Sequence, residues 1–423
     1  MRFKQYKLAA VVMAVALVVA GCGSKNQMEI FTWWASGGEA AGLKGMTDVF
    51  TKENPKLKFV NAAVAGGAGV NAKAVLISRM EAKNPPDTFQ AHAGQEIASY
   101  IKAGNLEDLT SLYASEGWDK VFPAGLIKTL TIGGKIYGVP VNIHRANVLW
   151  WNPAAAKKAG ITAAPKTLAE FFTDLEKFKK SGIDGIALAG NGDWAIAHLF
   201  DYTLLASMGP DKYNGLWDGK TAWSGPEVKA AIANFKKILS YGNSDKSLDW
   251  PTAGKLVTSG KAGFFIMGDW ASAQWQSDGL KLGTDYTFAA APGTVGIYQW
   301  LSDSFTLPVG AKHKEAALAW LKVCGSLAGQ DTFNPLKGSI AVRTDSDPTK
   351  YDAYLQSAMA DWKKDTLVGS TVHGVNMNNG FMAAYNTVVG KYYNGGAKDD
   401  AGFAMELADA FTANPNALSL IHI

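Results

Sequence analysis

The sequence predicts an α/β protein built from two domains. The chain has 423 residues, which is more than one ordinary domain holds. Short apolar segments with strand character alternate with longer segments of helical periodicity. Such alternation is typical of α/β lobes in which helices cover mainly parallel sheets. Hydrophobic residues make up 48% of the chain, enough to fill two cores.

The first residues have the pattern of a secretory leader. Three basic residues precede an apolar run, Leu8–Ala20, that is shorter than a comfortable membrane span. The run ends in small residues before Cys22, which resembles a bacterial lipobox. We therefore predict a lipoprotein signal peptide over residues 1–21, a lipidated Cys22 and a tether over 22–28. The alternative is a buried cysteine beside an ordinary cleavage site.

The mature chain opens with a strand, a tight turn and a helix. Trp33 and Trp34 stand at the end of the strand, small and Gly-rich residues follow, and the helix is expected over Ala40–Phe50. In α/β proteins, ligands bind where strands end. Two indole rings with Glu39 nearby would suit a neutral, hydroxyl-rich ligand, because indoles pack on C–H groups and a carboxylate accepts hydroxyl hydrogen bonds. The alternative is that both indoles belong to the core.

The remaining elements follow from periodicity and from turn residues. The clearest helix starts at Thr167, which with Glu170 forms a capping box. Further strands are expected over 57–63, 88–92, 135–140, 148–151, 185–189, 262–267 and 286–291. Helices are expected over 71–82, 95–102, 167–180, 195–241 with a break at 211–225, 255–259, 314–328, 350–363 and 376–391. The final hexapeptide, 418–423, fits no element and is predicted to be a non-native tail.

Charge and cysteine content exclude several kinds of function. The formal net charge is +4, and the leader supplies most of it, so the mature chain gives no basis for a nucleic-acid partner. Cys324 would be a buried, inert thiol within a helix. No spacing typical of a metal site or a nucleophile elbow is present, and the glycines at 66–69 lack the Lys-Ser/Thr of a phosphate loop. We expect no metal and no cofactor.

Several motifs together resemble one family. They are the lipobox leader, WW-x4-E, PPD-x-FQAH, GGKIYGVPVNIHRANVLWWN, FFIMGDWA and WLSDSF. In this order they resemble the extracellular solute-binding proteins of ABC importers, in the branch that binds glucose, mannose and related sugars. The resemblance covers about residues 26–415.

The resemblance implies two α/β lobes joined by a hinge that the chain crosses more than once, as in type II periplasmic binding proteins. Lobe 1 would comprise 29–143 and 302–340, and lobe 2 would comprise 144–301 and 341–417. The crossings are expected near 141–146, 298–305 and 340–344. A sugar would bind in the cleft, and closure would be a hinge motion.

The resemblance also implies a set of sugar-binding residues. They are Trp33, Trp34, Glu39, Gln90, His92, Trp250, Trp270, Asp303, Lys337 and His373. The residues themselves allow a structural role for each. Gln90 and His92 leave the same face of one strand and could be a core pair. Trp250 is predicted in a polar loop as a lid or as a plug, and Trp270 follows a strand end.

The charged members of this set have alternatives too. Asp303 and Lys337 could be solvated surface charges, or could hydrogen-bond sugar hydroxyls if both face one cleft. His373 alone would suggest a structural histidine. Asp193 and Trp194 are further candidates in a similar loop, and Trp275 and Trp300 are assigned to packing.

The sequence therefore predicts a monomeric, lipid-anchored receptor that captures a monosaccharide and delivers it to the transmembrane subunits of an ABC permease, at the periplasm or cell surface. Two alternatives remain open. One is a secreted glycoside hydrolase, which would need two carboxylates flanking the glycosidic bond. The other is an importer receptor for an oligosaccharide or another neutral solute.

Overall fold

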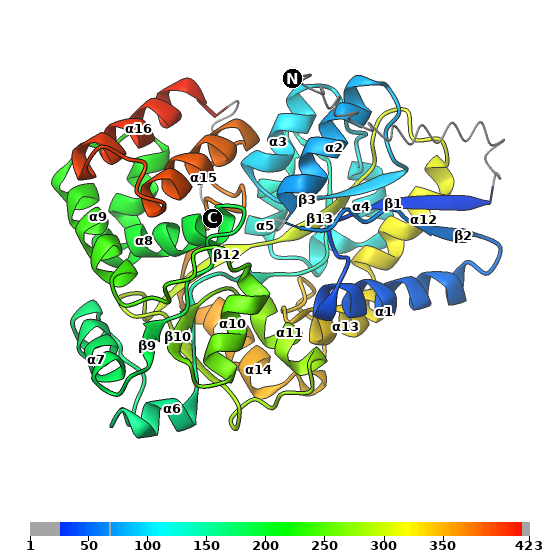
Figure 1. The fold of residues 1–423 in the computed structure, drawn as a ribbon. Helices are drawn as coiled ribbons and strands as arrows, with labels where there is room; N and C mark the ends of the chain where they lie inside the picture. The colour runs from blue at the N-terminus through cyan, green and yellow to red at the C-terminus, as the bar shows by residue number, and fades with distance from the viewer. Residues whose placement is uncertain (1–25, 67–68, 417–423) are drawn as a thin grey trace, which may run out of the picture.

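The computed structural model describes residues 26–66 and 69–416, so the predicted leader, Cys22 and the C-terminal tail lie outside the described residues. Within the described part, no helix is both long and apolar enough to cross a membrane. The chain folds into two lobes, which lie side by side in Figure 1.

The first lobe is built on a five-stranded sheet with the order β2-β1-β3-β13-β6. Strands β1 (Gln27–Phe31), β2 (Lys58–Asn61) and β3 (Thr88–His92) are parallel, as the strand–helix alternation predicts. The fourth strand, β13 (Asp303–Thr306), arrives from much later in the chain and runs antiparallel to β3 and β6 (Val139–Pro140). In this register Asp303 lies opposite His92.

Helices from both ends of the first lobe's sequence surround this sheet (Figure 1). They are α1 (Gly37–Glu53), α2 (Val70–Glu81), α3 (Gln95–Lys102), α4 (Thr110–Glu116), α5 (Ala124–Thr129), α12 (Lys314–Gly325) and α13 (Leu327–Lys337). A small hairpin pairs β4 (Thr131–Ile132) with β5 (Lys135–Ile136). Cys324 is fully buried in α12, as predicted.

The second lobe departs from the prediction of mainly parallel sheets. Its four-stranded sheet has the order β11-β8-β10-β9, and β8 (Val148–Trp151) is antiparallel to both β10 (Ala262–Ile266) and β11 (Thr287–Ala290). Only β9 (Asp184–Ile186) and β10 pair in parallel. Strand direction depends on where the chain enters the sheet, and alternation along the sequence carries no information on that.

The helices of the second lobe differ from the prediction in two places. The expected break at 211–225 is wrong at its start, because α8 (Trp194–Trp217) kinks at Gly209 and then continues from Pro210. Proline suits the first turn of such a restarted helix. Helix α10 begins at Trp250 rather than near residue 255, because the Asp249 carboxylate accepts a hydrogen bond from the Thr252 N–H and so caps it.

The other helices of this lobe are α6 (Pro153–Lys158), α7 (Leu168–Lys180), α9 (Pro226–Leu239), α11 (Trp270–Ser277), α14 (Ala353–Lys364), α15 (Asn379–Tyr393) and α16 (Asp400–Ala413). The predicted capping box of α7 is present in full. Trp275 and Trp300 are almost completely buried, in agreement with their assignment to packing.

A third sheet lies where the lobes join. It consists of β7 (His144–Arg145), β12 (Ile297–Leu301) and β14 (Thr366–Gly369). Strand β7 follows β6 of the first lobe within a few residues, and β12 leads directly into β13. Ile143 and Ile340 exchange backbone hydrogen bonds of 2.8 and 3.0 Å. The three segments predicted as hinge crossings are therefore hydrogen-bonded neighbours.

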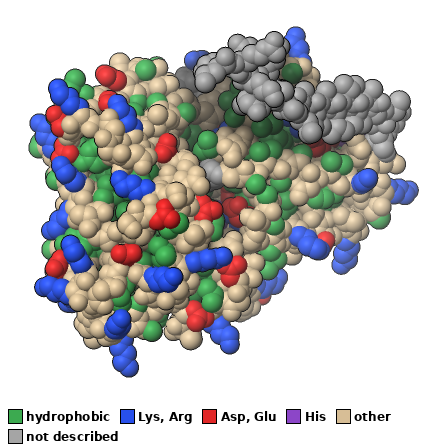
Figure 2. Space-filling model, viewed as in Figure 1, with side chains coloured by type: hydrophobic (Ala, Val, Ile, Leu, Met, Phe, Trp, Pro, Cys, Tyr) green, Lys and Arg blue, Asp and Glu red, His purple; other side chains and the backbone are tan. Residues whose placement is uncertain are grey.

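Acidic and basic side chains are interspersed over the face of the molecule shown in Figure 2. This mixture agrees with the nearly balanced charge of the sequence. A continuous basic surface, which a nucleic-acid partner would need, is not visible on the described part of that face.

Candidate functional site

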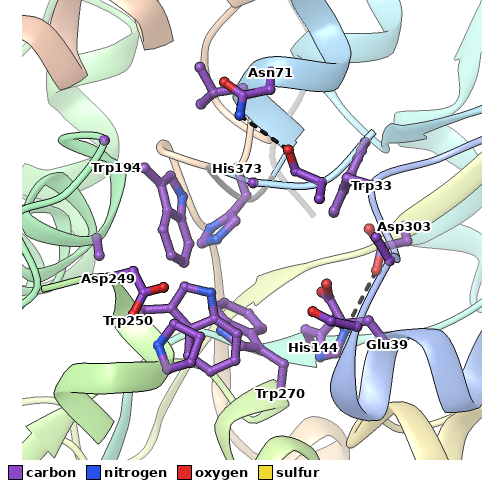
Figure 3. Close-up of a pocket in the computed structure, with 18 of the residues that line it drawn as sticks. Trp33, Glu39, Asn71, His144, Trp194, Asp249, Trp250, Trp270, Asp303 and His373 are labelled. Atoms are coloured by element: carbon purple, nitrogen blue, oxygen red, sulfur yellow. Dashed lines mark hydrogen bonds and ion pairs between the residues drawn. The ribbon is translucent and has the colours of Figure 1, made fainter. Parts of the chain in front are cut away.

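A cavity of about 490 Å³ lies between segments of the two lobes (Figure 3). Eight of the ten predicted site residues line it, and Gln90 and Trp34 do not. The eight are Trp33, Glu39, His92, Trp250, Trp270, Asp303, Lys337 and His373. Trp33 lies on one side of the opening, and Trp194, Trp250 and Trp270 lie on the other. The indoles from two distant parts of the sequence thus face one space.

The Trp33 side of the cavity is held by a chain of polar contacts. The Trp33 ring lies 5.2 Å from the His92 ring between centroids. Nδ1 of His92 is 2.7 Å from Oε2 of Glu96, a fully buried carboxylate that also accepts a 2.8 Å hydrogen bond from Lys73 Nζ. Burial would raise the pKa of Glu96, but the neighbouring Lys73 and His92 lower it below its ordinary value. Glu96 is therefore ionised and orients His92.

Asp303 is the buried anion of the site. Its oxygens accept hydrogen bonds of 2.7 Å from the side-chain amides of Gln90 and Asn142. Nε2 of His144 lies 3.5 Å from Oδ2. Burial opposes ionisation, yet contact with His144 and the positive charge of Lys337 hold the pKa of Asp303 far below its usual range. The carboxylate is thus a permanent acceptor.

The cation of the site is Lys337, at the C-terminal end of α13. Its Nζ donates a 3.1 Å hydrogen bond to Oε1 of Glu39, in the first turn of α1. Only 2% of Lys337 is exposed, whereas Glu39 is partly exposed. The ammonium group also lies 5.6 Å from the Trp34 ring and 6.0 Å from the Trp270 ring. A buried charge with these partners is fixed in position.

His144 lines the cavity, although sequence reasoning did not single it out. Its Nδ1 contacts Oδ1 of the buried Asp269, which also accepts a 2.8 Å hydrogen bond from the Arg145 N–H. Burial lowers the pKa of His144, but the charge of Asp269 together with contacts to Asp269 and Asp303 more than offsets it, so the pKa of His144 is raised. The sequence feature that could have identified His144 is its position within the NIHRAN motif, which lies in a predicted hinge crossing.

Trp270 forms the floor of the cavity within a ring of other aromatic side chains. Its centroid lies 5.3 Å from His144, 5.3 Å from His373 and 6.0 Å from Trp194. The indole is 6% exposed, so its neighbours fix its orientation. Trp194, the first residue of α8, lines the same space, whereas the other weak candidate, Asp193, does not.

His373 lines the cavity near Trp194 (Figure 3). Its Nδ1 is 2.7 Å from the Ser370 hydroxyl, and its buried Nε2 has no hydrogen-bond partner among residues 26–66 and 69–416. Burial, reinforced by His198, lowers the pKa of His373 well below its ordinary value, so the ring is neutral. An unsatisfied nitrogen at a cavity wall can be satisfied by a ligand.

Trp34 and Gln90 stand behind the cavity wall rather than on its surface. Trp34 is completely buried and packs against Phe333 at 4.8 Å between ring centroids. Gln90 donates to Asp303 and its carbonyl oxygen contacts the Thr32 hydroxyl. Gln90 and His92 leave the same face of β3, as their spacing predicts. His92 pairs with Asp303 near the end of β3, whereas Gln90 pairs with Phe305 further from that end and so lies behind the cavity wall.

Several polar residues complete the lining. Asn71, Asn191 and Asp249 also line the cavity, and Asn71 donates a 3.1 Å hydrogen bond to the Ala65 carbonyl. Within 26–66 and 69–416, no cluster of His, Cys, Asp and Glu could hold a metal ion. The arrangement as a whole offers flat apolar faces with fixed hydrogen-bonding groups between them, which suits a molecule that carries both C–H faces and hydroxyls.

Comparison with known proteins shows the same fold and related sequences. Residues 34–331 match the family described as bacterial extracellular solute-binding protein. An uncharacterized ABC transporter extracellular-binding protein of Pyrococcus horikoshii is 34% identical, over 97% of each chain. A probable sugar-binding periplasmic protein of Brucella suis is 35% identical, over 93% of this chain and 95% of its own.

A solved structure shares the architecture at low sequence identity. The bacterial solute receptor AcbH, described as having an exclusive substrate preference for β-D-galactopyranose, superposes with a TM-score of 0.81. The superposition covers 92% of this chain and 99% of AcbH at 15% identity. At that identity the likeness concerns the fold.

Proposed function

The chain belongs to the bacterial extracellular solute-binding proteins of ABC sugar transporters, and from this premise we propose that it captures a monosaccharide of the glucose or mannose type. The sugar would lie in the cavity between the lobes and be delivered to the transmembrane subunits of the permease. Binding proteins of this family act outside the cytoplasmic membrane, in the periplasm or at the cell surface.

The observation that carries this proposal is the opposition of Trp33 to Trp194, Trp250 and Trp270 across one cavity (Figure 3). An indole packs well on the C–H face of a pyranose ring. Between the indoles, the ionised Asp303 and the Glu39–Lys337 pair offer strong acceptors and a donor for hydroxyls. Contacts from both lobes would stabilise the closed arrangement, as a ligand-driven closure requires.

The ligand is expected to be neutral. The two arginines near the site motifs are occupied elsewhere: Arg145 binds Asp361 at 2.6 Å, and Arg343 binds Asp345 at 2.7 Å. Neither lines the cavity. An anionic solute would require uncompensated positive charge, whereas Lys337 is already paired with Glu39.

The ligand's size is the second question. A volume of about 490 Å³ lies in the lower half of the range typical of small-molecule sites. This favours a monosaccharide over a long oligosaccharide. Calorimetry of the unlipidated mature protein should show saturable binding to one or a few monosaccharides and much weaker binding to disaccharides. Tight binding of a trisaccharide, with none to monosaccharides, would favour the oligosaccharide receptor instead.

A glycoside hydrolase is the competing function, and the state of Asp303 argues against it. A general acid must carry a proton near neutral pH, whereas Asp303 is held ionised and the other candidate carboxylate, Glu39, accepts a hydrogen bond from the Lys337 ammonium group. We propose that the protein is not an enzyme. Incubation with aryl glycosides and oligosaccharides should release no product, and turnover that disappears in Asp303→Asn would overturn this assignment.

The mode of attachment is a further part of the proposal. We infer that Cys22 is lipidated, that residues 22–28 form a tether, and that the receptor works as a monomer. Expression of the full chain with labelled fatty acid should label the wild type and not Cys22→Ser. We also propose that residues 29–143 and 302–340 form lobe 1, and that residues 144–301 and 341–417 form lobe 2. Limited proteolysis can test these boundaries.

A further inference from the structure

A buried chain of hydrogen bonds runs from Asp201 to His373. Asp201, in α8, is 1% exposed, and its Oδ2 accepts a 3.1 Å hydrogen bond from the Ser370 hydroxyl. The same hydroxyl oxygen lies 2.7 Å from Nδ1 of His373. The His373 ring lines the cavity, while Asp201 and Ser370 do not.

The donors around Asp201 determine the direction of this chain. Its carboxylate also accepts hydrogen bonds from the Tyr213 hydroxyl at 2.7 Å, the Gln299 amide at 3.0 Å and the Thr371 N–H at 3.1 Å. These four contacts, with the one from Ser370 included, mark Asp201 as an acceptor, because a carboxylate accepts stronger hydrogen bonds than a neutral ring nitrogen does. The single hydroxyl proton of Ser370 therefore points to Asp201, and Ser370 Oγ must accept from His373.

We propose that Asp201 and Ser370 are positioning residues that hold His373 in the Nδ1–H tautomer, so that its Nε2 accepts a hydrogen bond from the ligand. The tautomer of a histidine is set by the partner of its other nitrogen. Nε2 is buried and has no protein partner in the described residues, so its lone pair is available to a ligand donor.

This tautomer selects ligands by chemistry. A lone pair at Nε2 can be satisfied by an O–H or N–H group, but not by an ether oxygen, a fluorine or a carboxylate. Leaving a buried acceptor unpaired is costly, so sites built in this way reject analogues that lack the donor. The ligand side of the inference rests on the proposed function, whereas the tautomer does not.

The first test reads the tautomer without any ligand. The protein is labelled with ¹⁵N-histidine, and long-range ¹H–¹⁵N correlation spectra are recorded at pH 7.5. Burial raises the pKa of Asp201 to about 6, so it is ionised at that pH. We expect Nδ1 of His373 to be protonated and Nε2 to be bare. A protonated Nε2 would overturn the proposal.

The positioning role is tested by Ser370→Ala. Without the hydroxyl, the His373 signals should lose the pure Nδ1–H pattern and shift toward a mixture of tautomers. Ser339→Ala is the matched control, because Ser339 is equally buried and makes one side-chain hydrogen bond, to Asn334 Oδ1 at 2.7 Å. An unchanged tautomer in Ser370→Ala, with the fold retained, would show that Ser370 does not set it.

The ligand requirement is tested with analogues of whichever sugar binds in calorimetry. At one ring position, both the deoxy and the fluoro analogue should bind at least tenfold more weakly to the wild type. That penalty should shrink in His373→Phe. If no position shows a penalty that depends on His373, the acceptor role is wrong. If no sugar binds at all, the proposed function fails while the tautomer measurement still stands.

Discussion

Lys337 Nζ lies 3.1 Å from Glu39 Oε1, although the two residues are 298 positions apart in the sequence. The pair joins the start of α1 to the end of α13, and both side chains line the cavity. It is also the point at which the opening motif of the chain meets a segment near its last hinge crossing. The site therefore depends on contacts that only the folded chain creates.

Replacing Lys337 with Met should weaken sugar binding without abolishing the fold. The change leaves Glu39 unpaired and removes a donor to the ligand, and hydrogen bonds to charged groups contribute about 1.5–3 kcal/mol. We expect the Kd to rise by roughly ten- to a hundredfold in calorimetry. Lys391→Met is the control, because Lys391 pairs with Glu406 on the surface. An unchanged Kd in Lys337→Met, compared with the wild type, would show that Lys337 does not bind the ligand.

Trp250→Ala should lower affinity with little loss of stability. The side chain is half-buried at the start of α10 and lines the cavity, so truncation mainly removes a stacking surface. The Tm should fall by only a few degrees, and the Kd should rise about tenfold or more. Trp362→Ala, half-buried outside the cavity, should leave the Kd unchanged.

Trp270→Ala is expected to behave differently from Trp250→Ala. Because Trp270 is 6% exposed and surrounded by aromatic rings, its truncation should cost both affinity and about 3–5 kcal/mol of stability. Chemical denaturation beside calorimetry separates the two effects. Loss of affinity with unchanged stability would mean that the ring contributes little to packing.

His198 should make the protein less stable as the pH falls from about 6.5 to 4. Burial lowers its pKa to about 4, although a contact with the Ala146 backbone acts in the other direction. The unfolded chain then binds a proton, at about pH 6.5, before the folded chain does, so folding stability is full above pH 6.5 and declines below it. The difference between the folded-state pKa of about 4 and the ordinary value corresponds to roughly 3 kcal/mol of stability.

The measurement compares His198→Phe with the wild type across this pH range. Asp201, whose pKa burial raises to about 6, acts in the opposite direction, with stability lost as the pH rises through 6. The difference between variant and wild type cancels that contribution. We expect the Tm of His198→Phe minus the Tm of the wild type to rise steadily as the pH falls from 6.5 to 4. If this Tm difference stays constant, His198 is not a buried neutral histidine.

Gly38→Ala should hinder the approach of α1 to α11. A Cβ at Gly38 would lie 2.6 Å from Cβ of Ala273, closer than real Cβ atoms come, and 3.0 Å from the Leu336 carbonyl oxygen, which is tighter than most real Cβ contacts. We expect a larger radius of gyration in small-angle scattering and a Kd at least tenfold higher. Gly402→Ala, in the helix α16, is the control, because its Cβ would come no closer than 3.3 Å to a neighbour, the Asp399 side chain, and it should change neither quantity.

The sequence predicts the first lobe more closely than the second. Strands β1, β2 and β3 each lead into a helix, and the structure pairs them in parallel as expected. Strand β8 lies between two antiparallel partners, one of them more than 130 residues later in the chain. Pairing over such distances depends on tertiary packing, which local periodicity does not encode.

The candidate site shows the same limit at the level of single residues. Motif positions identify Trp33, Asp303 and Lys337, all of which line the cavity. The two that do not line it are Gln90, whose position depends on the pairing of β3 with β13, and Trp34, which packs against Phe333. His144 was missed because its importance arises from Asp269 and Asp303, which reach it only after folding.

Cys324 is completely buried in α12, and the sequence contains one other cysteine, Cys22, which precedes the described residues. A secreted version that starts after Cys22 would thus present no reactive thiol to dyes while it stays folded. Fluorophores could be attached to cysteines introduced at the cavity rim, one on each lobe, without interfering background. The protein is in this respect a ready scaffold for an optical sugar sensor, in which energy transfer between the dyes would report occupancy.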